Sequence, residues 1–380
     1  MPAKTTCTRT VTISACSSST SSDLSAMIRG EFTLKTAPQT SLGWLALQCR
    51  AGLIGAAVIG SATHASVPEG TAPAETAVNS VSTLLTDIVK TGDQYVAVGW
   101  RGHILRSDNA RDWHQAKVPV NVLLTAVEFV DPLRGWVVGH DGVILHTTDG
   151  GEQWVVQQFN PGASALLDVM FFNASNGIAV GTYGAMFSTS DGGVTWIRSE
   201  NALTDEGFHF NDLTRLGNGA VLVVGEFGTL AISTDAAATW SALDSPYDSS
   251  LFAAAPLGDR GAVIGGLRGN LFVTRDVTSG EWARIDNAAK QSIFGLTPLG
   301  DQRYAVAALN GTLQVLDGRT LKQLTLDKAK AGIPPAEPSG PPYVLVLTDD
   351  VDRELGAFVR ALPLGSGLLT VGDAGVRYWR

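Results

Sequence analysis

Short runs of apolar and β-branched residues recur along most of the chain, and turn-forming residues separate each run from the next. The stretch after Leu123 shows the pattern. One apolar run ends at Asp131, a second begins at Trp136, a third at Val143 and a fourth at Trp154. The runs are short and have no helical period, which predicts β-strands rather than helices.

A turn phrase of the form small residue-x-x-Gly stands between the second and third run of each unit. It occurs seven times and ends at Gly102, Gly142, Gly184, Gly228, Gly269, Gly311 and Gly375. Successive glycines are 40, 42, 44, 41, 42 and 64 residues apart. Such a period is typical of propeller blades, because a four-stranded sheet buries both faces only against neighbouring sheets. The sequence therefore predicts an all-β, seven-bladed β-propeller of four-stranded antiparallel blades over residues 84–380.

The two ends of this repeat array predict further features. The long last interval contains a Pro-rich insertion over residues 327–345. The seventh unit ends one strand short of four, and an open sheet edge is a liability. We therefore expect the segment 74–83, within a linker over residues 66–83, to supply the missing outer strand and close the ring.

A second phrase, containing Asp, Gly and Trp, recurs between the third and fourth strands. An Asp carboxylate can accept N–H bonds within its own loop, Gly supplies a positive φ, and Ser or Thr closes the loop locally. The Trp that ends the phrase is expected to pack between blades. The predicted structural residues are Thr147, Asp149 and Trp154 in unit two, Thr189, Asp191, Gly193, Thr195 and Trp196 in unit three, and Ser233, Asp235 and Trp240 in unit four.

The turns between second and third strands converge on one end of a propeller, around its channel, and the Asp phrases face the opposite end. Aromatic residues and Arg are enriched at protein interfaces, so this first end is the predicted partner-binding rim. The connection 199–210 and the Pro-rich insertion open on the same side. The alternative is that these residues form ordinary polar surface. The predicted rim residues are Trp100, Arg101, His140, Asp141, Tyr183, Glu226, Phe227, Arg268, Asn310 and Asp373.

Charge and composition exclude several classes of function. A formal net charge of −9 argues against nucleic acid binding, which needs a basic face. The three cysteines, Cys7, Cys16 and Cys49, precede the repeats, so the repeats hold no cysteine nucleophile or CxxC metal site. His103 and His140 lack metal-ligand spacing. We therefore expect no metal and no cofactor.

Residues 1–65 have the order of a signal peptide: a basic stretch, an apolar run over residues 51–60, and small residues up to Ala65. Met27 is an alternative start of this segment. The apolar run is too short to span a bilayer stably, although a membrane anchor or a buried strand remains an alternative interpretation. Cleavage near Ala65 predicts a periplasmic or secreted protein that does not span the membrane after signal removal. We expect a monomer.

The Asp phrase resembles the Asp-box, or BNR, repeat S/T-x-D-x-G-x-T-W, which is complete at Thr189–Trp196. Seven such units behind a predicted signal are similar to the photosystem II assembly and stability factors of cyanobacteria and plastids, and the resemblance covers residues 84–380. It implies a non-enzymatic propeller that helps a membrane protein complex to assemble through an arginine-bearing surface. Arg101 and Arg268 are the best matches to that surface.

An enzyme of the sialidase type is the alternative that the BNR repeat raises. Such an enzyme needs three arginines, a Tyr activated by a Glu, and an Asp acid/base. Tyr183 and Glu226 form the one candidate pair, and the Arg-Ile-Pro motif is absent. The hypothesis from the sequence is therefore an exported, non-enzymatic scaffold or assembly factor for a membrane or envelope protein complex. A sialidase-like glycoside hydrolase or a carbohydrate-binding propeller is the alternative.

Overall fold

The computed structural model describes residues 67–379, apart from residues 288–289, 318–321 and 326–355. The predicted signal segment 1–65 and the Pro-rich insertion 327–345 lie outside the described residues.

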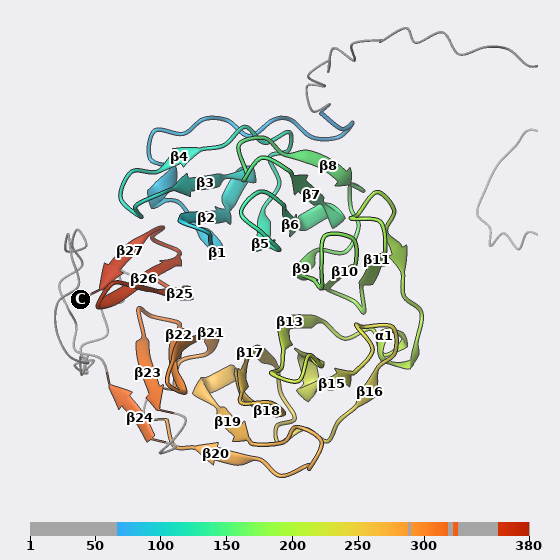
Figure 1. The fold of residues 1–380 in the computed structure, drawn as a ribbon, viewed down its shortest axis with the longest axis vertical. Coiled ribbons are helices and arrows are strands. Elements are labelled where there is room, and N and C mark those ends of the chain that lie inside the picture. The colour runs from blue at the N-terminus through green and yellow to red at the C-terminus, as the bar shows by residue number, and fades with distance from the viewer. Residues whose placement is uncertain (1–66, 288–289, 318–321, 326–355, 380) are drawn as a thin grey trace, which may run out of the picture. The chain divides into compact units, whose positions relative to one another are not determined.

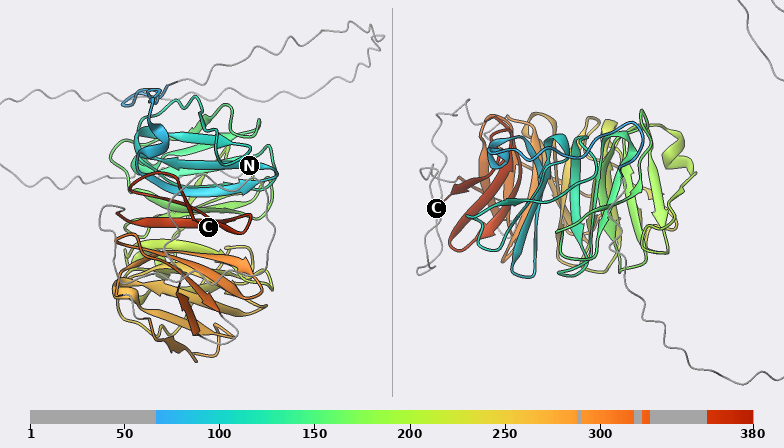
Figure 2. Two further views of the ribbon diagram at one scale, coloured as in Figure 1. Left: turned by 90° about the vertical axis from the view of Figure 1, so that its left-hand side faces the viewer. Right: turned by 90° about the horizontal axis from the view of Figure 1, so that it is seen from above.

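Seven antiparallel sheets stand around one axis, and the first strand of each sheet lies nearest the centre (Figure 1). In six sheets four strands follow in chain order, and the described part of the seventh has three. Figure 2 shows the same blades from the side, with their connecting turns gathered at two opposite ends. The predicted seven-bladed propeller is confirmed.

Blades 1 to 4 contain the following strands. Blade 1 has β1 (Leu85–Thr91), β2 (Gln94–Gly99), β3 (Ile104–Ser107) and β4 (His114–Gln115). Blade 2 has β5 (Leu124–Phe129), β6 (Gly135–Gly139), β7 (Ile144–Thr147) and β8 (Val155–Gln158). Blade 3 has β9 (Leu166–Phe171), β10 (Gly177–Gly181), β11 (Met186–Thr189) and β12 (Ile197–Arg198). Blade 4 has β13 (Phe210–Arg215), β14 (Val221–Gly225), β15 (Leu230–Ser233) and β16 (Ser241–Ala242).

Blades 5 to 7 complete the ring. Blade 5 has β17 (Leu251–Leu257), β18 (Gly261–Gly266), β19 (Leu271–Thr274) and β20 (Ala283–Ile285). Blade 6 has β21 (Ile293–Gly300), β22 (Arg303–Ala308), β23 (Leu313–Asp317) and β24 (Lys322–Thr325). Blade 7 has β25 (Phe358–Leu364), β26 (Gly367–Gly372) and β27 (Arg377–Trp379).

The described helices are single turns between strands. Four 3₁₀ turns join the second and third strands of blades 1, 2, 4 and 5: η2 (Trp100–Gly102), η3 (His140–Gly142), η4 (Glu226–Gly228) and η5 (Leu267–Gly269). A further 3₁₀ turn, η1 (Ser80–Ser82), precedes β1, and α1 (Ala202–Asp205) lies between blades 3 and 4.

The hydrophobic core is divided among the interfaces between blades. Seven clusters of buried apolar residues lie one at each junction, from blades 1 and 2 round to blades 6 and 7 and back to blade 1. Trp136 of β6 shows how such a junction packs, since its ring stacks on Phe171 of β9 in the next blade with a centroid distance of 3.5 Å. Each blade therefore buries its faces against its neighbours, as the repeat pattern predicts.

The predicted outer strand of blade 7 is not formed by residues 74–83. This segment contains the turn η1, and its polar groups are used instead on the outer edge of blade 1. Ala74 N donates a hydrogen bond to Val118 O at 2.9 Å, and Ala77 N donates to Gln115 Oε1 at 3.0 Å. Towards blade 7, Val81 O accepts a hydrogen bond from Val376 N, and the Val81 side chain packs against the apolar cluster shared by blades 7 and 1.

Blade 1 itself packs against blade 7 and closes the ring. Buried side chains of both blades, among them Leu85 and Leu369, share one apolar cluster. On the inner strands, Arg360 Nε donates to Asp87 Oδ1 at 2.9 Å. Towards the outside, the Tyr378 hydroxyl donates to the Ala110 carbonyl. Closure is therefore a face-to-face blade contact like the other six.

Candidate binding rim and central channel

The turns between second and third strands share one backbone conformation. Their third residue has a φ between +50° and +57° in six blades, at Arg101, Asp141, Tyr183, Phe227, Arg268 and Asn310. The next residue is a glycine with positive φ, and a Cβ at Gly102 would collide with the Val120 carbonyl oxygen. In blade 7 the third residue, Ala374, does not adopt this positive φ, and the Asp373 carboxylate accepts a hydrogen bond from Ala357 N at 2.8 Å.

The structure places the predicted rim residues at the surface of these turns. Trp100 is 44% exposed, Tyr183 69% and Phe227 67%. The remaining residues are exposed or half-buried: Arg101, His140, Asp141, Glu226, Arg268, Asn310 and Asp373. Arg101 and Arg268 belong to blades 1 and 5, so two blades separate them on the shorter way around the ring. The two arginines therefore stand apart and do not adjoin in one basic patch.

The candidate catalytic pair of Tyr183 and Glu226 is not hydrogen-bonded in the described part of the chain. Glu226 Oε2 instead accepts a hydrogen bond from His209 N at 3.2 Å and lies 3.6 Å from His209 Nδ1. Tyr183 packs edge-on against the same imidazole, with ring centroids 4.9 Å apart. A nucleophilic Tyr needs direct contact with its activating Glu, so this geometry does not favour the glycosidase alternative.

At the opposite end, the Asp phrases form tight hydrogen-bonded turns. In blade 3, Thr189 Oγ1 donates to Asp191 Oδ1, while Thr195 N donates to the same oxygen, both at 2.9 Å. Gly193 N donates to Thr189 Oγ1 at 2.9 Å. The bonds from Thr195 and Thr189 hold the pKa of Asp191 below its ordinary value, and matching bonds led by Thr239 lower that of Asp235 to about 2. The carboxylates are thus used inside their own loops.

The tryptophans of these turns pack to different depths. Trp154 is fully buried between blades 1 and 2, and its Nε1 donates to Gly151 O at 3.1 Å. Trp196 and Trp240 are half-buried, and their indole NH groups have no hydrogen-bond partner among the described residues.

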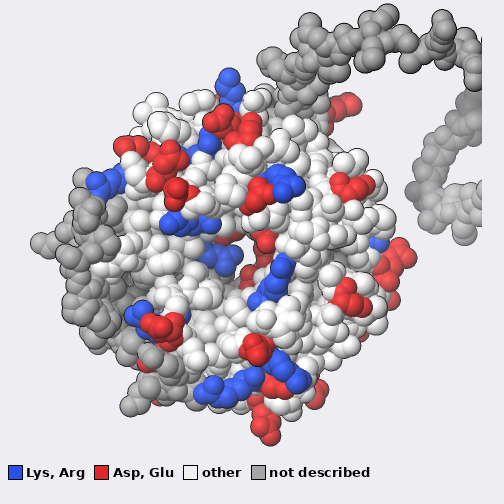
Figure 3. All heavy atoms as spheres, in the orientation of Figure 1, with Lys and Arg blue, Asp and Glu red and all other residues white. Residues whose placement is uncertain are grey.

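The inner strands carry a feature that the sequence analysis missed. Each has a β-bulge near its start, and the residue after the bulge lies against the next blade. That position holds Asp87, Ala126, Asp168, Asp212, Ala253, Gly295 and Arg360 in blades 1 to 7. Figure 3 shows side chains of both charges in the central hollow. An Asp recurring at one repeat position inside apolar strands was the available signal.

The three aspartates hold adjacent blades together. Each accepts a hydrogen bond from a backbone N–H of the next blade's inner strand. Asp87 accepts from Val127 at 3.0 Å, Asp168 from Leu213 at 2.7 Å, and Asp212 from Ala254 at 2.7 Å. Glu128 of β5 makes a similar bond, since its Oε2 accepts from Phe171 N at 2.7 Å. The channel carboxylates therefore connect blades 1 to 5 in pairs.

Burial changes the protonation of this channel. It raises the pKa of Glu128 to about 8 and that of Asp212 to about 6. The pKa of Asp168 lies well above its ordinary value because of burial and of repulsion from Asp212. Asp87, Asp212 and Asp168 in turn hold the pKa of Arg360 above its ordinary value. Carboxylates outnumber cations here, so the channel favours bound protons near neutral pH.

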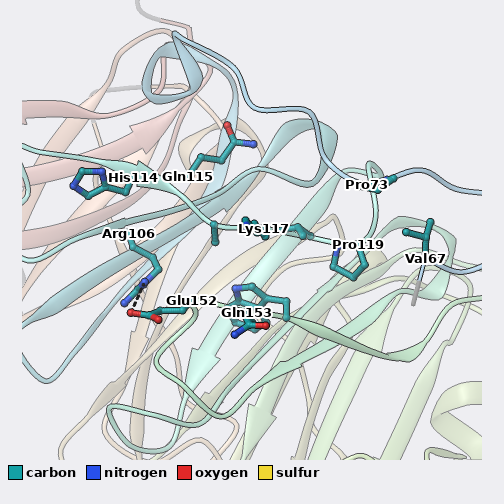
Figure 4. Close-up of a pocket in the computed structure, with 12 residues that line it drawn as sticks. Val67, Pro73, Arg106, His114, Gln115, Lys117, Pro119, Glu152 and Gln153 are labelled. Carbon is teal, nitrogen blue, oxygen red and sulfur yellow. Dashed lines mark ion pairs between the residues drawn. The ribbon is translucent and has the colours of Figure 1, made fainter. Parts of the chain in front are cut away.

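A groove of about 570 Å³ lies on the outer edge of blades 1 and 2 (Figure 4). Val67 and Pro73 of the N-terminal segment form one wall, and Trp154 lines the groove as well. Arg106 Nη1 lies 3.6 Å from Glu152 Oε1 within it. The sequence repeats did not predict this groove, because the N-terminal segment that bounds it lies outside the repeat.

Neither a metal cluster nor a membrane-crossing helix is found within the described ranges. No three His, Cys, Asp or Glu side chains there gather as metal ligands would. None of the helices described is long and apolar enough to span a bilayer.

The ring of seven antiparallel blades, with left-handed turns at one end of six blades and Asp-containing turns at the other end, defines a repeat β-propeller of the BNR type. The family model described as Photosynthesis system II assembly factor YCF48 matches residues 105–294, half of the chain. The chain therefore belongs to this family.

Curated relatives and solved structures agree with that assignment. The chain is 42% identical over 53 residues to a chloroplastic photosystem II stability/assembly factor HCF136 from Guillardia theta, and the match spans 13% of this chain and 13% of that protein. The structure of YCF48 bound to D1 peptide has a TM-score of 0.60 at 16% identity and covers 79% of this chain and 94% of its own. YCF48 from Cyanidioschyzon merolae has a TM-score of 0.58 at 16% identity, covering 83% and 98%. At these identities the solved structures establish the fold alone.

Proposed function

We propose that this propeller is a non-enzymatic assembly or stability factor that binds a segment of a membrane or envelope protein complex. Membership of the YCF48 family and the shared fold support a photosystem II assembly factor-like role. One YCF48 structure contains a D1 peptide, so a propeller of this fold binds a peptide of another protein. The proposal includes export by the predicted signal segment and action as a monomer.

The observation that carries the proposal is the conformation of the rim turns. A left-handed backbone costs a non-glycine residue on the order of 1 kcal/mol, and Gly, Asn or Asp adopts it most readily. Four of the six described turns nevertheless place Arg101, Tyr183, Phe227 or Arg268 there. Residues held in costly conformations cluster at functional sites. We therefore assign partner binding to the rim, in preference to ordinary polar surface.

The rim assignment is tested by recovery of partners from solubilised membranes of the source organism. The double variant Arg101→Ala/Arg268→Ala removes both exposed guanidinium groups from the rim turns. We expect the wild-type chain to retain a defined set of membrane proteins and the double variant to recover at least tenfold less.

The matched control is Arg198→Ala/Arg275→Ala, which removes two exposed arginines outside the rim turns, on β12 and after β19. This control should recover the same proteins as the wild type. Equal recovery by the rim variant and the control variant would contradict the proposed function.

A further inference from the structure

Three aromatic side chains on blades 3 and 4 form one continuous patch on the rim, here called the aromatic sector: Tyr183, Phe208 and Phe227. Tyr183 and Phe227 are 69% and 67% exposed. Phe208 packs on Phe227 with ring centroids 5.0 Å apart. The next residue, His209, makes an edge-on ring contact with Tyr183. The sector therefore crosses the junction between two blades, and the imidazole of His209, not a direct ring contact, links Tyr183 to the Phe208–Phe227 pair.

Two features of the aromatic sector, backbone strain and exposure of an aromatic ring, are unfavourable for stability and occur at the same two residues. Tyr183 and Phe227 occupy the left-handed position of their turns, with φ of 55° and 50°. A bulky residue at such a φ is an outlier, and Asn or Gly would fit the turn with less strain. Exposure of a large aromatic ring is the second cost. Stability alone does not favour either residue here, which points to a ligand of the sector.

The connection from blade 3 to blade 4 holds the sector in a fixed shape. Asn201 caps α1, because its Oδ1 accepts hydrogen bonds from Leu203 N at 3.0 Å and Thr204 N at 3.2 Å. Gly184 N donates to Phe208 O at 2.9 Å and so joins this connection to the turn of Tyr183. A pre-formed surface loses less entropy when a partner binds.

The charge around the sector is negative. Glu200, Asp205 and Glu206 are exposed on the connection, and Glu226 precedes Phe227 in its turn. No Lys or Arg occurs from Ser199 to Thr214. The imidazole of His209 lies beside one of these carboxylates, with its Nδ1 3.6 Å from Glu226 Oε2. The complementary ligand carries positive charge.

We propose that the aromatic sector binds a short basic segment of a partner protein, with apolar or aromatic side chains on Tyr183 and Phe227 and Lys or Arg beside the carboxylates. The inference rests on the proposed function, because the sector is part of the partner-binding rim. It assigns to blades 3 and 4 a ligand of opposite charge to the one that Arg101 and Arg268 would attract.

The test measures the binding of labelled peptides to the full chain by fluorescence anisotropy. The first probe is a nonapeptide that alternates Lys with Phe and Leu. The second has Glu in place of Lys, and the third keeps Lys but has Ser in place of Phe and Leu. We expect the first probe to bind the wild type at least tenfold more tightly than either of the others. Equal affinity for the first and third probes would show adhesion to net charge and would overturn the proposal.

The double variant Tyr183→Asn/Phe227→Asn removes the sector while relieving its turns. We expect at least a tenfold loss of affinity for the first probe, with an unchanged or higher Tm. The control Leu133→Asn removes a side chain that is 58% exposed at the opposite end, and it should bind like the wild type. Affinity of the double variant within twofold of the wild type would overturn the inference.

Failure of this inference is distinguishable from failure of the proposed function. If the sector variant keeps its peptide affinity but Arg101→Ala/Arg268→Ala loses its membrane partners, only the sector assignment is wrong. If neither rim variant changes the recovery of membrane proteins, the rim itself is not the partner site.

Discussion

Single side chains on the inner strands connect blades 1 to 5, each to the next. The hydroxyl of Thr86 donates to Leu124 O at 2.7 Å, and that of Thr125 donates to Leu166 O at 2.6 Å, both across a blade junction. The carboxylates of Asp87, Asp168 and Asp212 accept backbone N–H groups across three such junctions. Because burial raises the pKa values of Asp168 and Asp212, the protonation of these two carboxyls is coupled to the stability of the ring.

Glu128 makes this coupling measurable. Burial raises its pKa to about 8, against 4.5 for the unperturbed group. The charges of Arg215, which lowers this pKa, and Asp87, which raises it, have smaller effects. Between these pH values the folded protein binds one proton more than the unfolded chain, so stability falls as pH rises. The variant Glu128→Gln has no such proton. We expect the free energy of unfolding of this variant to exceed that of the wild type by about 1–2 kcal/mol at pH 8. This is less than the free energy that corresponds to the whole pKa shift, because the side chain is only half-buried. The difference should vanish near pH 4.5.

Urea unfolding at pH 4.5, 6 and 8 measures this difference. Glu152→Gln, at an exposed carboxylate of the outer groove, is the control and should show no comparable trend. Asp168 and Asp212 titrate in the same direction in both proteins, so the difference isolates Glu128. A gap between Glu128→Gln and wild type that does not change with pH would refute the raised pKa.

At the scale of elements, local turns could be predicted from the sequence and contacts between distant strands could not. In the turn that ends at Gly102 and in the turn from Thr189 to Trp196, the hydrogen-bonding partners lie within a few residues of one another. Residue types and their spacing are therefore enough to predict these turns. Asp168 meets Leu213, which lies 45 residues away, and a bulge decides which side chains face the channel. A bulge shifts register by one residue and leaves no strong sequence signal.

For the N-terminal segment and for the candidate catalytic pair, too, contacts between distant parts of the chain could not be predicted from the sequence. Residues 74–83 had the right position in the chain to complete blade 7, but Gln115 and Val118 on blade 1 offered them hydrogen-bond partners. Equivalent repeat positions suggested that Tyr183 and Glu226 would meet. The intervening His209 comes from the connection between blades, which the repeat does not specify.

The third turn of blades 1 to 5 ends in a tryptophan, and we expect the burial of that side chain to set its contribution to stability. Trp154 is fully buried and its NH is bonded, so Trp154→Ala should destabilise the protein by about 3–5 kcal/mol through cavity formation. Trp196 is half-buried and its NH lacks a partner within the described residues, so Trp196→Ala should cost clearly less. Chemical unfolding of both variants measures the two costs. An equal or larger cost at Trp196 would mean that the turn, and not burial, sets the contribution.

On the scale of the whole molecule, the stability of the closed ring depends on the contacts at the junction where its last blade meets its first. The junction of blades 7 and 1 joins the two ends of the described repeat array, and the described part of blade 7 has three strands instead of four. Three groups of contacts hold it: one shared apolar cluster, the hydrogen bonds of the Tyr378 hydroxyl with the third turn of blade 1, and the pair Arg360–Asp87. Of these, the ion pair alone also reaches the carboxylates of blades 3 and 4.

Arg360 is therefore predicted to be the main electrostatic determinant of ring closure. Arg360→Met keeps most of the side-chain volume but leaves Asp87, Asp168 and Asp212 without their shared cation, and loss of one partner of a buried pair costs about 3–5 kcal/mol. Without the cation the folded-state pKa values of Asp168 and Asp212, which burial already raises, rise further, so the folded protein holds still more protons than the unfolded chain as pH rises. The deficit relative to wild type should then be larger at pH 8 than at pH 5. Arg198→Met, which removes an exposed arginine on β12 away from the closing junction, is the control. Hydrogen exchange should accelerate first in β1 and β25 of Arg360→Met. Uniform acceleration across all blades, together with a loss of stability that does not depend on pH, would show that ring closure does not depend on the charge of Arg360.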